Sequence, residues 1–240
     1  MIRHNCAQGS EEWHGLRLGK PTASNFDRIL TPGGKLSTQS HTFALVLASE
    51  RILGYPSDKV TTAAMKAGRE NEPAAAALYE LQHPGAEVEE VGICFTGDGL
   101  VGASPDRLVG SDGLLEVKCP EPHTHLGYML NYEGAAREYW HQIQGQLWVC
   151  ERDWLDMLSY CPGFPPCLRR VARDEEYIAK LKSALDAFNE SMLKIMEALT
   201  SMGCREMLIE ERVRAQAAPD DDGLGVSMAD VEAILAAKGL

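Results

Sequence analysis

The stretch GASPDRLVGSDGLLEVKCP, residues 102–120, decides how this chain is interpreted. Two short strand-like segments, 106–110 and 114–118, flank a Ser-Asp-Gly turn. If the hairpin is symmetric about Ser111, Asp106 faces Glu116, with Cβ atoms about 4.5–5.5 Å apart. Because side chains alternate along a strand, Glu116 and Lys118 share one face and Val117 points the other way, into a core. The spacing therefore predicts two carboxylates and a lysine on one side of a hairpin.

This trio indicates metal-assisted chemistry. Two facing carboxylates repel each other, and Mg²⁺ between them removes the repulsion, since it prefers carboxylate, phosphate and water oxygens. A metal held there polarises a phosphodiester and activates a water molecule, while Lys118 orients that water or stabilises the developing charge. The alternative is a surface hairpin with a cross-strand ion pair. The setting favours chemistry, because Glu116 and Lys118 lie in an otherwise apolar strand where a charge needs a partner.

Composition limits the classes of protein to consider. The chain has 240 residues, 45% of them apolar and 24% charged, which excludes a disordered or fibrous protein. Its net charge of −12 excludes a general nucleic-acid coat, so any DNA contact must be local or use metal ions. No apolar run is long enough to span a membrane, and the N-terminal segment lacks a secretory signal. Seven scattered cysteines without a CxxC spacing indicate reduced thiols and a cytoplasmic location.

Hydrophobic periodicity predicts the elements along the chain. A helix starts at Thr22, and further helices are expected over 41–53, 62–82, 134–149 and 174–200. Within 62–82, Pro73 either begins a new helix or kinks the run. Strands are expected over 88–95, 100–103, 106–110, 114–118, 154–160 and 167–172. Residues 204–226 are expected to be an acidic linker, and Ser227 to cap a short last helix. This order predicts an α+β or mixed α/β fold with one central sheet.

Four motifs carry a resemblance to a known family. SPD followed by LEVKCP resembles the PD-(D/E)xK nuclease signature. The segments 8–24, 68–80 and 139–149 (QGSEEWHGLRLGKPTAS, GRENEPAAAALYE and YWHQIQGQLWV) resemble the remaining motifs of the lambda exonuclease / YqaJ recombinase family, in the family's order. The resemblance implies a restriction-endonuclease-like core, a central mixed sheet flanked by helices, in a single domain over 1–203, with 204–240 as an unmatched tail.

The resemblance also implies an activity. Members degrade one strand of linear double-stranded DNA from its 5′ end with Mg²⁺, for which Mn²⁺ is a possible substitute, and leave 3′ single-stranded tails for homologous recombination. The expected partners are DNA ends, two further copies of the chain in a trimeric ring, and a single-strand annealing protein. The expected location is the cytosol of a bacterium or a phage-infected cell, with no membrane contact.

Carried over by motif, the resemblance assigns residues to the chemistry. Asp106, Glu116 and the Val117 carbonyl would be metal ligands, and Lys118 the catalytic lysine. Glu72 would contact the second metal or its water, and Gln142 would help to place that group. An alternative for Glu72 is an N-cap of a helix that begins at Pro73.

The resemblance assigns a second group of residues to the DNA end. Arg17, Ser24 and Ser104 would hold the 5′ phosphate, for which a guanidinium and small hydroxyls are suited. The alternatives are that Arg17 packs on Trp13 and that Ser24 caps a helix. Asp98 matches a further acidic position only across a one-residue gap, and otherwise belongs to a Gly-Asp-Gly turn.

Three other activities remain open from the sequence. One is an iron–sulfur-type single-strand nuclease, which needs clustered cysteines. Another is a non-enzymatic DNA-end-binding module. A third is a site-specific endonuclease, for which no base-reading segment is evident.

Overall fold

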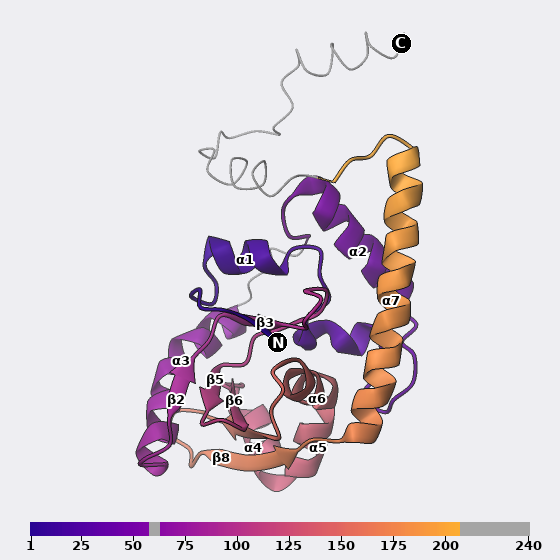
Figure 1. Cartoon of the computed structure of the whole chain (residues 1–240). Helices are drawn as coiled ribbons and strands as arrows, with labels where there is room; N and C mark the ends of the chain where they lie inside the picture. Colours follow the sequence, from indigo (N-terminus) through magenta and orange to yellow (C-terminus); the bar gives the residue numbers. More distant parts are fainter. Residues whose placement is uncertain (58–62, 207–240) are drawn as a thin grey trace.

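A five-stranded mixed sheet forms the centre of the protein (Figure 1). The computed structural model describes residues 1–57 and 63–206. The strand order is β2–β5–β6–β7–β8, and every neighbouring pair is antiparallel except β6 and β7, which are parallel. The bounds are β2 Val88–Glu90, β5 Arg107–Val109, β6 Gly113–Lys118, β7 Trp154–Ser159 and β8 Cys167–Ala172. The parallel pair requires a crossover, which three helices supply.

A second, three-stranded sheet lies beside the first, so the expectation of one central sheet was incomplete. Its order is β1–β3–β4, from Ile2–His4, Ile93–Phe95 and Gly102–Ala103. The strand expected over 88–95 is in fact two strands in two sheets. The chain passes from β2 to β3 at Gly92, where a Cβ would lie 2.4 Å from the Cys6 carbonyl oxygen. Only glycine allows this close approach to the N-terminal segment.

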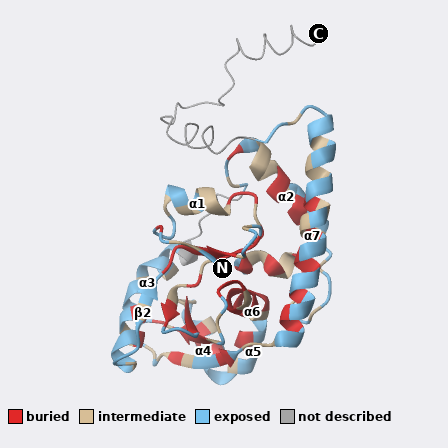
Figure 2. Cartoon of the chain, viewed as in Figure 1, coloured by how far each residue is buried: buried red, intermediate tan, exposed pale blue. Residues whose placement is uncertain are grey.

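Two helices cover opposite faces of the central sheet. α3 (Ala63–Gln82) packs Ala75 and Tyr79 against Leu115 and Val117 on one face. α6 (Trp140–Val149) packs on the other face, in the main core, and Figure 2 shows it largely buried. α3 continues through Pro73, so no new helix begins there and the N-cap alternative for Glu72 was wrong. Between these two layers β6 is buried along its whole length except at Lys118, which is half-buried.

The other helices frame this core. α1 Glu11–Arg17, α2 Ser40–Leu53, α4 Pro122–Leu130 and α5 Tyr132–Glu138 surround it, together with a 3₁₀ helix at Ala23–Arg28. The expected start at Thr22 is confirmed, although the helix is 3₁₀. The helix expected over 134–149 is two helices, since the chain bends at Tyr139 between α5 and α6. α1, α4 and β1 were not predicted.

The long C-terminal helix α7 (Glu175–Ser201) confirms the predicted apolar stripe. Its buried face includes Ile178, Leu181, Leu185 and Phe188, and the Phe188 ring stacks on Phe43 of α2 at 5.6 Å between centroids. Figure 1 shows α7 running along one side of the molecule beside α2. The tail was expected over 204–240, and all of it after residue 206, including the helix from Ser227, lies outside the described residues. Within the described ranges, no helix is long and apolar enough to cross a membrane.

Candidate active site

The predicted hairpin register is confirmed. β5 pairs with β6 through Arg107 opposite Leu115 and Val109 opposite Gly113, which is the pairing symmetric about Ser111. Asp106 comes directly before β5. Its Oδ2 atom accepts a hydrogen bond of 2.6 Å from the Val117 backbone N–H. The Asp106 side chain is therefore held against β6, next to Glu116.

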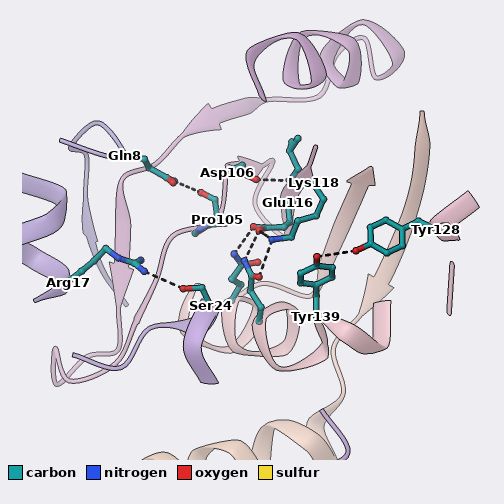
Figure 3. Close-up of polar contacts among 12 residues, drawn as sticks. Gln8, Arg17, Ser24, Pro105, Asp106, Glu116, Lys118, Tyr128 and Tyr139 are labelled. Carbon is teal, nitrogen blue, oxygen red and sulfur yellow. Dashed lines mark hydrogen bonds and ion pairs between the residues drawn. The ribbon is translucent and has the colours of Figure 1, made fainter. Parts of the chain in front are cut away.

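Glu116 is the centre of a hydrogen-bonded cluster (Figure 3). Its side chain is only 7% exposed, yet both carboxylate oxygens have donors. Oε1 accepts from Gln142 Nε2 at 2.6 Å and from Lys118 Nζ at 2.8 Å, and Oε2 accepts from Gln146 Nε2 at 2.7 Å. These charge-assisted hydrogen bonds offset the cost of burying the carboxylate and fix its orientation.

Lys118 is held in one position by three neighbours. Besides Glu116, its ammonium donates to Gln142 Oε1 at 3.1 Å and lies 4.5 Å from the centre of the Tyr139 ring. Burial lowers the pKa of Lys118, but the nearby Glu116 and Asp106 carboxylates outweigh burial, and the net pKa is raised. The lysine is therefore a fixed cation at neutral pH, suited to stabilising negative charge rather than to accepting a proton.

The acidic groups lie close enough to repel one another. The pKa of Asp106 is raised well above its usual range, first by burial and then by the Glu116 charge. The pKa of Glu72 is raised for the same two reasons. Glu72 lies on α3 and lines an open cavity of about 510 Å³ together with Asp106. Carboxylates crowded in this way are stabilised in their ionised form by a bound cation.

The donor set fits a magnesium ion. The backbone carbonyl of Lys118 accepts a hydrogen bond from the Tyr160 N–H on the β7 side of the strand. Because neighbouring carbonyls of a strand point to opposite edges, the Val117 carbonyl points to the other edge, where Asp106 lies. Asp106, Glu116 and this carbonyl would offer hard oxygen ligands, with water and phosphate to complete the shell. Among the described residues there is no group of three or more His, Cys, Asp or Glu side chains that could hold a metal ion by themselves. The ion would therefore also need the carbonyl, water and phosphate ligands.

Arg17 lies in a separate polar pocket. Its guanidinium donates to the hydroxyls of Thr22, at 2.8 Å, and of Ser24 and Ser104, both at 3.3 Å, and it stacks on Trp13 at 4.2 Å. Burial lowers the pKa of Arg17 to about 10. Within the described ranges, no carboxylate forms an ion pair with it. A half-buried cation surrounded by neutral hydroxyls is suited to binding an anion.

Comparison with known proteins assigns the chain to a family. The YqaJ-like viral recombinase domain matches residues 12–153, more than half of the chain. The chain belongs to this family. It is similar to the crystal structure of an alkaline exonuclease (LHK-Exo) from Laribacter hongkongensis, with 33% identity, 81% of this chain and 98% of that chain covered, and a TM-score of 0.73. A structure of LHK-Exo in complex with dAMP matches with the same identity and coverage and a TM-score of 0.72.

A third solved structure shows the fold alone. It is a phage-related exonuclease from Haemophilus somnus 129PT, with 16% identity, 75% of this chain and 96% of that chain covered, and a TM-score of 0.64. Among curated proteins, none matches the chain. Family membership confirms the restriction-endonuclease-like fold and makes this YqaJ-family protein a nuclease acting on DNA. Nucleases of this kind generally use divalent metal ions.

The structure separates the remaining expected site residue from the cluster. Asp98 lies exposed in the turn between β3 and β4, where its Oδ1 accepts from Thr96 Oγ1 at 2.5 Å and from the Leu100 N–H at 3.0 Å. Within the described ranges, no hydrogen bond or ion pair joins Asp98 to Asp106 or Glu116. Its role as a metal ligand therefore has no geometric support, whereas its role in the turn does.

Sequence reasoning overlooked Gln146 of this YqaJ-family protein. Gln146 is 1% exposed and holds the second oxygen of Glu116. The signal was present, because Gln142 and Gln146 are four residues apart and share one face of α6. Gln8 was overlooked as well. Its amide donates at 2.9 Å to the Val91 and Pro105 carbonyls, which secures the chain just before Asp106.

The seven cysteines give no support to an iron–sulfur site. All are free, and five of them are buried. Cys161 and Cys167 lie on the β7–β8 side, whereas Cys94 lies in the three-stranded sheet. Because such clusters need four thiolates around one site, the scattered arrangement favours the metal–carboxylate alternative.

Proposed function

We propose that this protein is a Mg²⁺-dependent 5′-to-3′ exonuclease that degrades one strand of linear double-stranded DNA. The observation that carries the proposal is the position of Asp106 and Lys118 on either side of the buried Glu116 carboxylate. Glu116 accepts a hydrogen bond of 2.8 Å from the Lys118 ammonium, and Asp106 accepts one of 2.6 Å from the backbone N–H of Val117, which lies between them in the strand. Oxygen ligands and a fixed cation beside one strand edge are what phosphodiester hydrolysis requires.

Each residue has a defined part in this chemistry. Asp106, Glu116 and the Val117 carbonyl would hold Mg²⁺, which supplies Lewis-acid activation when bound; Mn²⁺ would fit the same oxygen ligands. Lys118 would stabilise the negative charge that develops on the phosphate or its attacking water. Gln142 forms hydrogen bonds with both Glu116 and Lys118 and would keep the two side chains in fixed relative positions. Glu72, across the cavity, would bind a second metal or its water.

The 5′ polarity is supported by the Arg17 pocket. Arg17, Ser24 and Ser104 would bind the terminal 5′ phosphate, which supplies the anion that the desolvated guanidinium lacks. An end held there would present the first internal phosphodiester to the carboxylates. The release of one nucleotide at a time accords with a relative, LHK-Exo, having been crystallised with dAMP.

The biological setting follows from this polarity. Digestion of the 5′ strand leaves a 3′ single-stranded tail, the substrate of single-strand annealing in homologous recombination. We propose that the chain acts as a homotrimeric ring with a single-strand annealing protein as partner. Light scattering coupled to size-exclusion chromatography tests the trimer, and a monomer mass with and without DNA would contradict it.

The activity is tested with a linear duplex that carries a 5′ phosphate and a label at one 3′ end. We expect long single strands that keep the 3′ label in Mg²⁺ and none in EDTA or with Lys118→Ala. Lys180→Ala is the matched control, because Lys180 is exposed on α7 and pairs with the exposed Glu176. Loss of the 3′ label before the strand shortens would contradict the 5′-to-3′ polarity. An intact duplex in every lane would contradict the proposed nuclease activity.

A further inference from the structure

Arg69 is a cation that the chemistry above does not use. It lies on α3, three residues before Glu72, and its side chain is exposed. Within the described ranges it forms no hydrogen bond or ion pair. Its charge nevertheless lowers the pKa of Glu72 on one side and of His14 on the other. Arg69 is therefore close to both the carboxylate cavity and the N-terminal helix α1.

Arg69 lines two neighbouring cavities at once. The first, of about 510 Å³, contains Glu72 and Asp106. The second, of about 320 Å³, contains Arg17 and the Trp13 ring on which it stacks. The first cavity is thus lined by two of the carboxylates proposed to bind metal, and the second by the guanidinium proposed to bind the 5′ phosphate. Arg69 stands where they meet.

One further cation and one carboxylate in these cavities already have partners. Arg107, in the first cavity, pairs with Glu90 at 2.9 Å and donates to the Asp106 carbonyl at 2.7 Å. In the second cavity, the carboxylate of Glu50 accepts backbone N–H groups at both oxygens. Glu72 is close enough for the Arg69 charge to lower its pKa, but within the described ranges no carboxylate forms an ion pair with Arg69. A guanidinium in this situation is suited to a phosphate from outside the chain.

We propose that Arg69 binds the scissile phosphodiester of the DNA strand whose 5′ phosphate lies on Arg17. The proposal rests on the exonuclease function above. A single nucleotide links the terminal phosphate to the scissile one, and Arg69 lies between the two pockets that would receive them. On α3 it approaches the scissile phosphate from the Glu72 side, opposite Lys118. Arg69 would thereby position the substrate for cleavage at the first linkage.

The test removes the charge on each side of this contact. Duplexes with a 5′ phosphate carry either a normal phosphodiester or an uncharged methylphosphonate at the first linkage of the 5′ strand. Binding is measured by fluorescence anisotropy in Mg²⁺ with Lys118→Ala protein, with and without Arg69→Ala. Lys66→Ala is the matched control, because Lys66 is an exposed cation one turn earlier on the same helix. Arg69→Lys tests whether the planar donor fork is needed.

We expect Arg69→Ala to weaken binding of the phosphodiester duplex about tenfold or more, the usual effect of losing a charged phosphate contact. The same substitution should leave binding of the methylphosphonate duplex unchanged. On the normal duplex, the slope of log K against log salt concentration should become shallower by roughly 0.9. Equal weakening on both duplexes, or no weakening on either, overturns the proposal. Failure of the exonuclease function is distinct, because wild-type protein would then leave the duplex intact in Mg²⁺.

Discussion

The Asp106 carboxylate accepts a hydrogen bond of 2.6 Å from the backbone N–H of Val117. This side-chain contact continues the β5–β6 ladder beyond Arg107, where β5 begins. It fixes the Asp106 carboxylate beside Glu116. The protein thus holds two acidic groups together by backbone geometry, at a cost in electrostatic repulsion that its function requires.

This repulsion gives a prediction about stability and pH. The pKa of Asp106 is raised in the folded protein, so folding favours its protonated form, and stability is lost as pH rises through that raised pKa. We expect Asp106→Asn to abolish activity yet stabilise the metal-free protein above that pKa. A stabilisation of roughly 1 kcal/mol would raise Tm by about 2–4 °C in a chain of this size.

Thermal unfolding in EDTA between pH 4 and 8 measures the effect of Asp106→Asn. The difference from wild type should be small at pH 4 and grow with pH, and Mg²⁺ should stabilise wild type more than the variant. Asp112→Asn in the exposed β5–β6 turn is the control for a general change in net charge. A variant less stable than wild type at every pH would refute the repulsion.

A second prediction concerns Gln146. Its amide holds Glu116 Oε2 at 2.7 Å, so Gln146→Leu frees the carboxylate to rotate. Loss of a hydrogen bond that orients a metal ligand costs about 10–100-fold in metal affinity or activity. We expect a matching rise in the Mg²⁺ concentration needed for half-maximal rate. Titration calorimetry with Mn²⁺ gives the affinity directly.

Gln144, on the same helix, provides the contrast. It donates to the Ala172 carbonyl at 3.0 Å and accepts from the Asp174 N–H at 2.8 Å, so it joins α6 to the start of α7. Gln144→Leu should lower thermal stability and leave the Mg²⁺ requirement of the folded protein unchanged. If both variants alter the Mg²⁺ requirement alike, Gln146 has no special role.

A third prediction concerns how α3 is held on the sheet. The Tyr79 hydroxyl donates to the buried Asp156 carboxylate at 2.8 Å, and Arg170 binds both oxygens of Asp156 at 2.9 Å. Tyr79→Phe should cost about 1–3 kcal/mol in the free energy of unfolding, because it removes a buried hydrogen bond to a charged group. Urea unfolding measures the loss, and Tyr160→Phe is the control, because the half-buried Tyr160 side chain forms no hydrogen bond within the described residues. An unchanged free energy would show that Arg170 alone satisfies Asp156.

A fourth prediction concerns the DNA end. Arg17→Ala removes the guanidinium that donates to Ser24 and Ser104, so the enzyme should lose its preference for a 5′ phosphate over a 5′ hydroxyl. Arg17→Lys should keep part of the preference, since it keeps the charge without the planar fork. Initial rates on the two duplex ends measure the preference. If Arg17→Ala leaves the ratio of rates unchanged, the pocket does not bind the terminal phosphate.

Local patterns predicted the parts of the site that lie close together in the chain. The turn at Ser111 set the hairpin register, and strand alternation put Glu116 and Lys118 on one face, as the structure confirms. The stripe on α7 was predicted for the same reason, since its residues repeat at helical spacing. Family motifs added Gln142, whose contact with Glu116 spans 26 residues and has no local signal.

Other features depended on contacts between distant residues. Gly92 and Tyr139 each interrupt a segment that was predicted as a single element, and tertiary packing makes the breaks. The close approach of the 3₁₀ helix to α6 likewise depends on Gly145, where a Cβ would lie 2.5 Å from the Phe26 ring. The sequence alone does not reveal the roles of these positions, because glycine and aromatic residues occur in many structural settings.

By itself, then, the sequence determined the hairpin, its register and the carboxylate–lysine trio, since turn residues and a two-residue period are local properties of a strand pair. Only the tertiary structure decided that Gln146 orients Glu116, that Arg17 is enclosed by hydroxyls, and that Arg69 stands between the two cavities. Each of these depends on which surfaces pack together when α3, α6 and the N-terminal segment bury their apolar faces, and burial is a property of the whole chain.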